Sequence, residues 1–246
     1  MKASCKLCLK ESELEYSHII PEYFYKMMYD ENHRFMEISL ESEKLVKFYQ
    51  KGAREYLLCK DCENKFSKYE RYVSQFFYHK ELQGIEHDSR SFVFQGLDYT
   101  FMKLFQLSIL WRAAVTKLKL FSDVKLGPHS EKLRMMLLNE NPGNYYEYGC
   151  LQFAVIIDKD KLTDGLIMPP ALFRVEGYRI CRFTFGGVIW IYLISNHNNL
   201  FRWKDFFLLE NGNLTIFTKF FEDIKYLMDF GKVLVKEEKL KKYIDE

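Results

Sequence analysis

Long apolar segments are missing from this 246-residue sequence. The first 17 residues contain no apolar stretch of the kind that forms the core of a signal peptide. The most apolar run, residues 188–195 (VIWIYLIS), is much shorter than the ~20 residues that a membrane-spanning helix needs. We therefore expect a cytoplasmic protein with no membrane partner.

An excess of charge of either sign is also missing. The 36 Lys and Arg residues nearly balance the 34 Asp and Glu residues, which leaves a net charge of +2. Any contact with nucleic acid must then come from a local patch of the surface. A hydrophobic content of 48% and an aromatic content of 17% are ample for a packed core, and the length suits one large domain or two small ones.

Several familiar kinds of site are missing from the second part of the chain. Residues 92–246 contain no glycine-rich phosphate loop, no nucleophile elbow and no convincing carboxylate pair. Five of the histidines show no metal-ligand spacing with one another: His33, His79, His87, His129 and His197. The candidates for chemistry therefore lie in the first part.

Two CxxC pairs are the strongest motif in the sequence. The four residues are Cys5, Cys8, Cys59 and Cys62. Structural zinc prefers four such ligands in a tetrahedron, and intracellular cysteines stay reduced, so the spacing predicts one bound Zn²⁺. The alternatives are a thiol redox switch or buried, inert cysteines. Cys150 and Cys181 have no paired cysteine and are expected in the core.

A histidine segment lies between the two pairs. Its sequence, Tyr-Ser-His-Ile-Ile-Pro over residues 16–21, suggests a short strand that runs into a turn. Taken alone, His18 is better explained by packing beneath the zinc knuckle than by a functional role. The order of the motifs favours a functional role: CxxC, then His-Ile-Ile-Pro, then Leu-Leu-Cys-x-x-Cys opening a helix.

This order resembles the HNH endonuclease family in its zinc-bearing treble-clef (ββα-metal) form, over residues 5 to about 70. The resemblance implies that His18 is the general base and that the four cysteines bind structural zinc. It also implies a catalytic Mg²⁺ or Mn²⁺ near Ser17, Glu63 and the adjacent Asn64. Three positions depart from the family pattern. Ser17 stands where the family has Asp, Glu or His, Glu63 stands where it has His or Asn, and Arg54 stands at the place of its middle asparagine.

Basic residues recur along the helix expected after the second CxxC pair: Lys60, Lys65, Lys68 and Arg71. Such a row could hold a phosphate backbone near the metal, whereas the interspersed acidic residues fit an ordinary solvated helix face. Tyrosines and a phenylalanine around residues 16–29 could stack on bases, but residues 21–28 look more like a short helix that packs on the second part.

The pattern predicts an α+β fold in two domains. Residues 1–85 form the zinc-bound HNH-like module, with a helix from about Cys59 to Leu82, and residues 84–91 form a linker. Residues 92–246 form a larger recognition or partner-docking domain with a central buried helix over residues 98–121, a second helix after Gly127 and an antiparallel sheet. Its strands are expected at residues 150–157, 172–175, 178–185, 188–194 and 213–217, followed by helical segments over residues 219–230 and in the charged tail. Arg112, inside the buried helix, is expected in a structural salt bridge that joins the two parts, or otherwise as a phosphate clamp.

Two functions remain open at this point. One is a metal-dependent DNA endonuclease, by analogy a bacterial or phage defence protein, with DNA a better substrate than RNA. The other is a catalytically inactive treble-clef module that binds nucleic acid, a protein partner or a second copy of itself.

Overall fold

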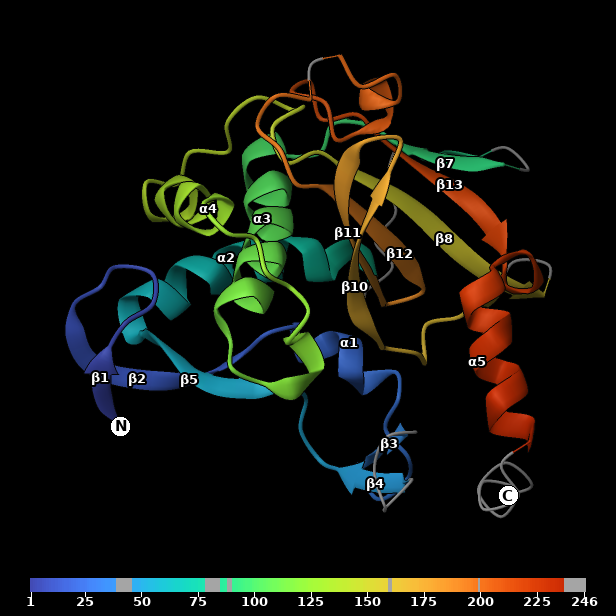
Figure 1. The fold of residues 1–246 in the computed structure, drawn as a ribbon, viewed down its shortest axis with the longest axis horizontal. Coiled ribbons are helices and arrows are strands. Elements are labelled where there is room, and N and C mark those ends of the chain that lie inside the picture. The colour runs from blue at the N-terminus through green and yellow to red at the C-terminus, as the bar shows by residue number, and fades with distance from the viewer. Residues whose placement is uncertain (39–45, 78–84, 88–89, 159–160, 199, 237–246) are drawn as a thin grey trace.

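The computed structural model describes residues 1–38, 46–77, 85–87, 90–158, 161–198 and 200–236. They form an α+β protein with a cysteine cluster near the N-terminus (Figure 1). Within these residues no helix combines the length and the apolar character needed to cross a membrane.

The first part contains a small antiparallel sheet followed directly by a helix. Strands β1 (Lys2–Ser4), β2 (Glu11–His18) and β5 (Arg54–Cys59) lie in the order β1-β2-β5, and α2 (Lys60–Phe77) begins at the residue after β5. The helix predicted from about Cys59 is confirmed at its start, and its predicted end lies outside the described residues. The sequence did not predict the hairpin of β3 (Phe35–Ile38) and β4 (Val46–Tyr49).

The short helix predicted after Pro21 is present as α1 (Tyr23–Lys26), and it packs against the second part. The ring of Phe24 meets the ring of Phe185 edge-on at 4.8 Å. A Cβ atom added at Gly186 would lie 2.4 Å from the Phe24 ring, so the neighbouring turn needs glycine there. This contact fixes the segment after His18 against the large sheet.

A mixed sheet of eight strands dominates the second part. Its order is β10-β11-β12-β8-β13-β7-β6, with β9 paired to β8. The strands are β6 (Ile85–His87), β7 (Ser91–Phe94), β8 (Cys150–Asp158), β9 (Lys161–Leu162), β10 (Met168–Val175), β11 (Tyr178–Phe185), β12 (Val188–Leu193) and β13 (Leu214–Phe220). The hairpin predicted at Gly186-Gly187 is confirmed, with φ of 61° and 73°, as a tight hairpin turn requires.

Two sequence expectations about this sheet were wrong. The sheet is not wholly antiparallel, because β13 pairs with β8 in parallel after a long connection that returns it to the sheet. The expected linker contains β6, which pairs with β7. A short polar strand is tolerated at the edge of a sheet, where periodicity gives little signal.

The helices of the second part are α3 (Tyr99–Val115), α4 (His129–Leu138) and α5 (Lys225–Lys236), with 3-10 turns at Lys119–Phe121, Lys204–Phe206 and Phe221–Asp223. Asp98 caps α3 by accepting a hydrogen bond from the Phe101 amide. The helix ends earlier than predicted because Thr116 turns into an extended conformation. The helix predicted over residues 219–230 begins only at Lys225, since β13 continues to Phe220.

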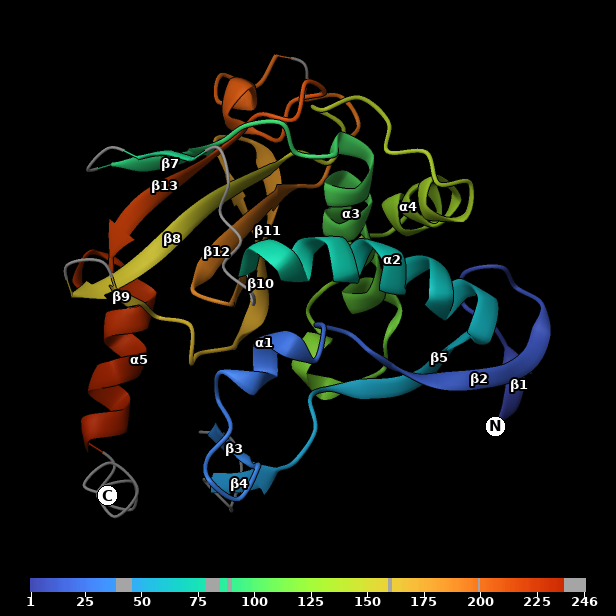
Figure 2. The same ribbon diagram turned by 180° about the vertical axis from the view of Figure 1, so that it is seen from behind.

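Helix α3 lies between α4 and the large sheet, and α2 crosses it (Figures 1 and 2). Its residues 102–113 are all buried, which confirms the central buried helix. Phe66 on α2 contacts Trp111 on α3 at 6.1 Å, and Phe105 on α3 contacts Trp190 on β12 at 6.2 Å. One continuous core therefore joins the two predicted parts.

Candidate metal centre and the adjoining histidine site

Two local turns bring the four cysteines together. Cys5 and Cys8 lie in the turn between β1 and β2, where Leu9 adopts a positive φ of 64° and its amide donates to the Cys5 carbonyl. Cys59 ends β5, and Cys62 lies in the first turn of α2. The Lys6 amide donates to the Leu57 carbonyl, which holds the first turn against β5.

The sulfur atoms have the spacing of a metal site. All four lie within 4.8 Å of one another, and Sγ of Cys8 is 3.8 Å from Sγ of Cys59. A tetrahedral site with Zn–S bonds of ~2.3 Å has edges of roughly 3.8 Å. All four residues have free thiols, and three of them are buried. The cluster could therefore hold a metal ion such as zinc.

The electrostatics of the cluster also favour a bound cation. Burial, the hydrogen bond with Cys59 and the charge of Cys5 raise the pKa of the Cys62 thiol. Four sulfurs at this spacing repel one another as thiolates unless a metal ion neutralises them.

Helix α4 supports the first cysteine turn from outside. Nη1 of Arg134 donates to the Leu7 carbonyl at 2.6 Å, between Cys5 and Cys8. Glu131 receives two further hydrogen bonds from the same guanidinium, at 2.7 and 2.8 Å, and thereby orients it. No sequence pattern predicts this contact, because it joins residues 127 positions apart.

The structure brings Ser17 and Glu63 together. The Ser17 hydroxyl donates to Oε2 of Glu63 at 2.6 Å, and Ser17 is 1% exposed. Glu63 follows Cys62 in the first turn of α2, so the cluster positions its carboxylate against the end of β2. These are the two positions at which the HNH resemblance implies metal ligands.

His18 has a different carboxylate partner. Its Nε2 lies 2.6 Å from Oε2 of Glu22, whose other oxygen accepts a hydrogen bond from the Tyr29 hydroxyl. The contact of the imidazole is therefore with Glu22 and not with Glu63, and the His18 side chain is 24% exposed. Burial lowers the pKa of His18, and Arg54 and Arg112 act in the same direction, while Glu22 opposes the shift. The sequence analysis missed Glu22 and Tyr29; the signal was the acidic residue four positions after His18.

Arg112 joins the two parts of the molecule, which confirms the structural salt bridge expected from the sequence. Its Nη1 lies 2.7 Å from Oε1 of Glu70 on α2 and donates to the His18 carbonyl at 2.7 Å. The side chain is fully buried and lies 5.4 Å from the centre of the Phe66 ring. This salt bridge fixes α2 and the end of β2 relative to each other.

The remaining predicted site residues are spread along α2. Lys60, Asn64, Lys68 and Arg71 are exposed. Lys65 donates to the Leu138 carbonyl at 3.0 Å and lies 3.4 Å from Glu140, so it also supports α4.

Cys150 and Cys181 are buried in the large sheet, as predicted. Among the described residues, the four N-terminal cysteines make up the one group of three or more His, Cys, Asp or Glu side chains with the spacing of a metal site.

Comparison with protein-family models, with curated proteins and with solved structures finds no match to this chain. The fold and the site define an α+β protein with a four-cysteine cluster that could hold a metal ion.

Proposed function

We propose that this protein is a metal-dependent endonuclease of the HNH type, in which a zinc-bound treble clef carries a hydrolytic site at His18. The contact between Ser17 and Glu63 carries the proposal. It joins the residue before His18 to the carboxylate beside the cysteine cluster, which is the arrangement that the order of the motifs led us to expect.

The chain's own residues suit the proton-transfer step. If Nε2 of His18 carries its proton toward Glu22, Nδ1 keeps the lone pair that can accept a proton from water. Tyr29 holds the Glu22 carboxylate in place, and Arg112 holds the His18 backbone. A positioned base of this kind typically contributes a factor of about 10² to 10⁴ to the rate.

A divalent ion has a place beside this base. Glu63 supplies one carboxylate and Ser17 a neutral oxygen, which fits Mg²⁺ or Mn²⁺ only if the phosphate and water complete the coordination. When bound, such an ion would stabilise the charge that develops on the phosphate.

The surface next to His18 suits nucleic acid. Tyr16 and Tyr56 lie opposite each other on β2 and β5, their rings stack at 4.8 Å, and both are about half exposed (47% and 45%). Arg54 lies opposite His18 in the register of β2 and β5. Its guanidinium is 4.4 Å from the centre of the Tyr16 ring. Exposed aromatic rings and a guanidinium can stack on bases and bind phosphate. Lys60, Lys68 and Arg71 on α2 add exposed positive charge.

The test is cleavage of supercoiled plasmid in Mn²⁺ or Mg²⁺ by the wild-type chain and three variants. His18→Ala and Glu63→Gln should lose activity by about 10² or more, since they remove the base and the metal carboxylate. Asp61→Asn is the matched control, because Asp61 is an exposed acid in the same helical turn. Equal cleavage by wild type and His18→Ala, at equal zinc content, would remove His18 from the mechanism.

One observation favours a second function, a treble-clef module that binds nucleic acid without cutting it. Ser17 is neutral, buried and already bonded to Glu63, which weakens the metal site. This alternative predicts salt-sensitive DNA binding, with no cleavage in Mg²⁺, Mn²⁺, Co²⁺ or Ni²⁺. Loss of binding in an Arg54→Ala, Tyr16→Ala double variant would place the contact on β2 and β5.

A further inference from the structure

A second site lies in the other part of the molecule, at the start of α4. A pocket of about 310 Å³ opens between the first residue of α4, the turn from β10 to β11, and the segment that follows β12. Two arginines and two histidines line it: His129, Arg174, Arg179 and His197. No acidic side chain is among its lining residues.

The basic side chains of this pocket form no ion pair with a carboxylate in the part of the chain that the structure describes. Within the described parts of the chain, none of the four side chains lies within 4.0 Å of an Asp or Glu oxygen. Glu176, on the same turn as Arg174, pairs instead with Arg202 at 3.3 Å. Burial lowers the pKa of His129, and the charges of Lys132, Arg179 and His197 lower it further. The neighbouring positive charges therefore disfavour protonation of His129, and a bound anion would favour it.

Internal hydrogen bonds hold the pocket in shape. Arg174 donates through Nη1 to the Gly177 carbonyl at 3.2 Å, and Arg179 donates through Nη2 to the Lys125 carbonyl. His129 Nδ1 lies 3.0 Å from the Tyr148 hydroxyl, and Asn198 donates to the Ser195 carbonyl at 2.9 Å. A guanidinium has five N–H donors, so each arginine keeps further donors for a ligand.

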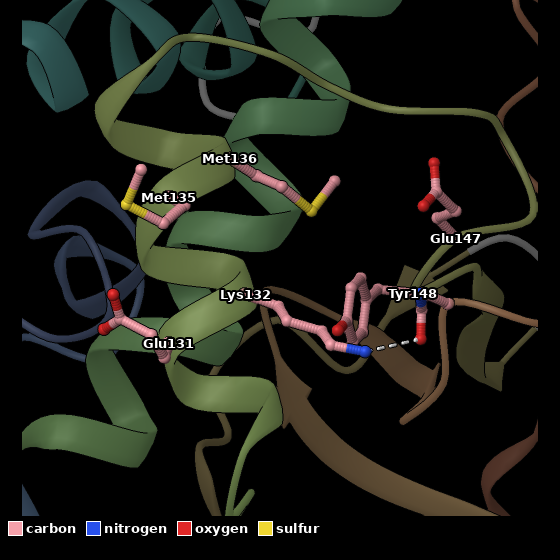
Figure 3. A pocket seen from close by; sticks show the side chains of 7 residues that line it. Glu131, Lys132, Met135, Met136, Glu147 and Tyr148 are labelled. Atoms are coloured by element: carbon pink, nitrogen blue, oxygen red, sulfur yellow. Dashed lines mark hydrogen bonds between the residues drawn. The ribbon is translucent and has the colours of Figure 1, made fainter.

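Lys132 lines a neighbouring pocket of about 360 Å³, together with the acidic side chains of Glu131 and Glu147. Figure 3 shows the Lys132 side chain directed toward Tyr148, whereas Glu131 and Met135 lie on another side of α4. The Lys132 ammonium donates to Oδ1 of Asn196 at 3.3 Å.

We propose that this pocket binds the phosphate group of a small phosphorylated molecule, held by Arg174, Arg179, His129 and His197. A phosphate ester carries up to two negative charges and several acceptor oxygens, so it matches several cations better than a single carboxylate does. The start of α4 adds the partial positive charge of a helix N-terminus. The volume suits a phosphate with a small body attached.

The test is a calorimetric titration of the full chain with pyrophosphate and with AMP, in phosphate-free buffer at low salt. The wild type should bind pyrophosphate with a Kd of about 1 mM or tighter. Arg174→Ala and His197→Ala should each weaken binding by about tenfold, since both side chains are exposed parts of the wall. Arg202→Ala is the matched control, because Arg202 is an exposed arginine near the turn that does not line the pocket.

The proposal would be overturned if the wild type bound neither pyrophosphate nor AMP, or if Arg202→Ala lost as much affinity as Arg174→Ala. A duplex DNA that displaces pyrophosphate, and whose affinity falls in Arg174→Ala, would assign the pocket to the nucleic-acid backbone and also overturn it. Displacement of pyrophosphate by AMP supports it. The titration needs no divalent metal and no cleavage, so its outcome is independent of the proposed nuclease activity.

Discussion

Arg112 is the residue whose buried charge links α3 to both α2 and the end of β2. It is fully buried, yet it carries a charge that no protein environment removes. Glu70 and the His18 carbonyl satisfy that charge from the first part of the chain, while Arg112 itself belongs to α3 in the second. The sequence predicted the need for a partner from the residue's place in an apolar helix. It could not identify Glu70, because the pairing depends on how α2 crosses α3.

Replacing Arg112 by Met should lower the free energy of unfolding by ~3–5 kcal/mol, because Glu70 then stays buried without a partner. Urea unfolding measures the change. Arg202→Met, which breaks the exposed pair with Glu176, should cost no more than ~1 kcal/mol. Adding Glu70→Gln to Arg112→Met should recover part of the loss. An effect of Arg112→Met as small as that of Arg202→Met would contradict the structural role.

Lys103 is a second buried charge, on α3, and it predicts a pH dependence. It is 1% exposed and donates to the carbonyls of Tyr145 and Tyr148, and burial lowers its pKa from 10.5 to about 8. Between these two values the unfolded chain binds more protons at Lys103 than the folded chain does. The contribution of Lys103 to stability therefore rises with pH through this window, by at most about 1.4 kcal/mol per pH unit.

The measurement is the difference in unfolding free energy between wild type and Lys103→Met from pH 7 to 10. The comparison cancels the titration of other groups. The free energy of unfolding of the wild type should rise relative to that of the variant as the pH rises above 8. A difference that stays flat over this range would show that Lys103 titrates normally in the folded protein.

At the scale of elements, the cysteine cluster depends on three segments: the turn after β1, the β5–α2 junction and α4. The sequence predicted the first two, since each CxxC pair is local and carries its own geometry. It could not predict that α4 reaches the Leu7 carbonyl through Arg134. The sequence pattern predicted α4, but the position of α4 against the cysteine cluster depends on tertiary packing.

Arg134→Ala should weaken zinc binding by about tenfold, because it removes the hydrogen bond that holds the first cysteine turn. The rate of zinc transfer to a coloured chelator measures this. Lys132→Ala is the matched control on the same helix, since Lys132 contacts Asn196 and not the cysteine turn. Equal release rates for the two variants would show that α4 plays no part in holding the metal.

The large sheet shows where periodicity succeeds and fails. Strands β8, β11 and β12 were predicted within a residue or so, because they are apolar and bounded by turn signals. The short strands β6, β7 and β9 were missed, and so was the parallel pairing of β13 with β8. Those features depend on contacts between segments far apart in the sequence, which a local pattern does not record.

At the scale of the whole molecule, the candidate site at His18 is held by the same core that joins the two parts of the chain. Helix α3 contributes to the core of both parts, and through Arg112 it holds the strand that ends at His18. The candidate site at His18 was predicted from motif order, whereas Glu22 and Tyr29 became visible only in the fold. The second pocket has no sequence signature, because its basic side chains come from four segments: the start of α4, β10, β11 and the segment after β12.

The most direct measurement of the central claim is chemical rescue at His18. The variant His18→Gly, with its zinc content matched to wild type, should cleave plasmid DNA about 10² to 10⁴ times more slowly in Mn²⁺. Added imidazole should then restore cleavage in proportion to its concentration, because it replaces the missing base in the space left by the side chain. Cleavage by His18→Gly at the wild-type rate, without imidazole, would contradict the account.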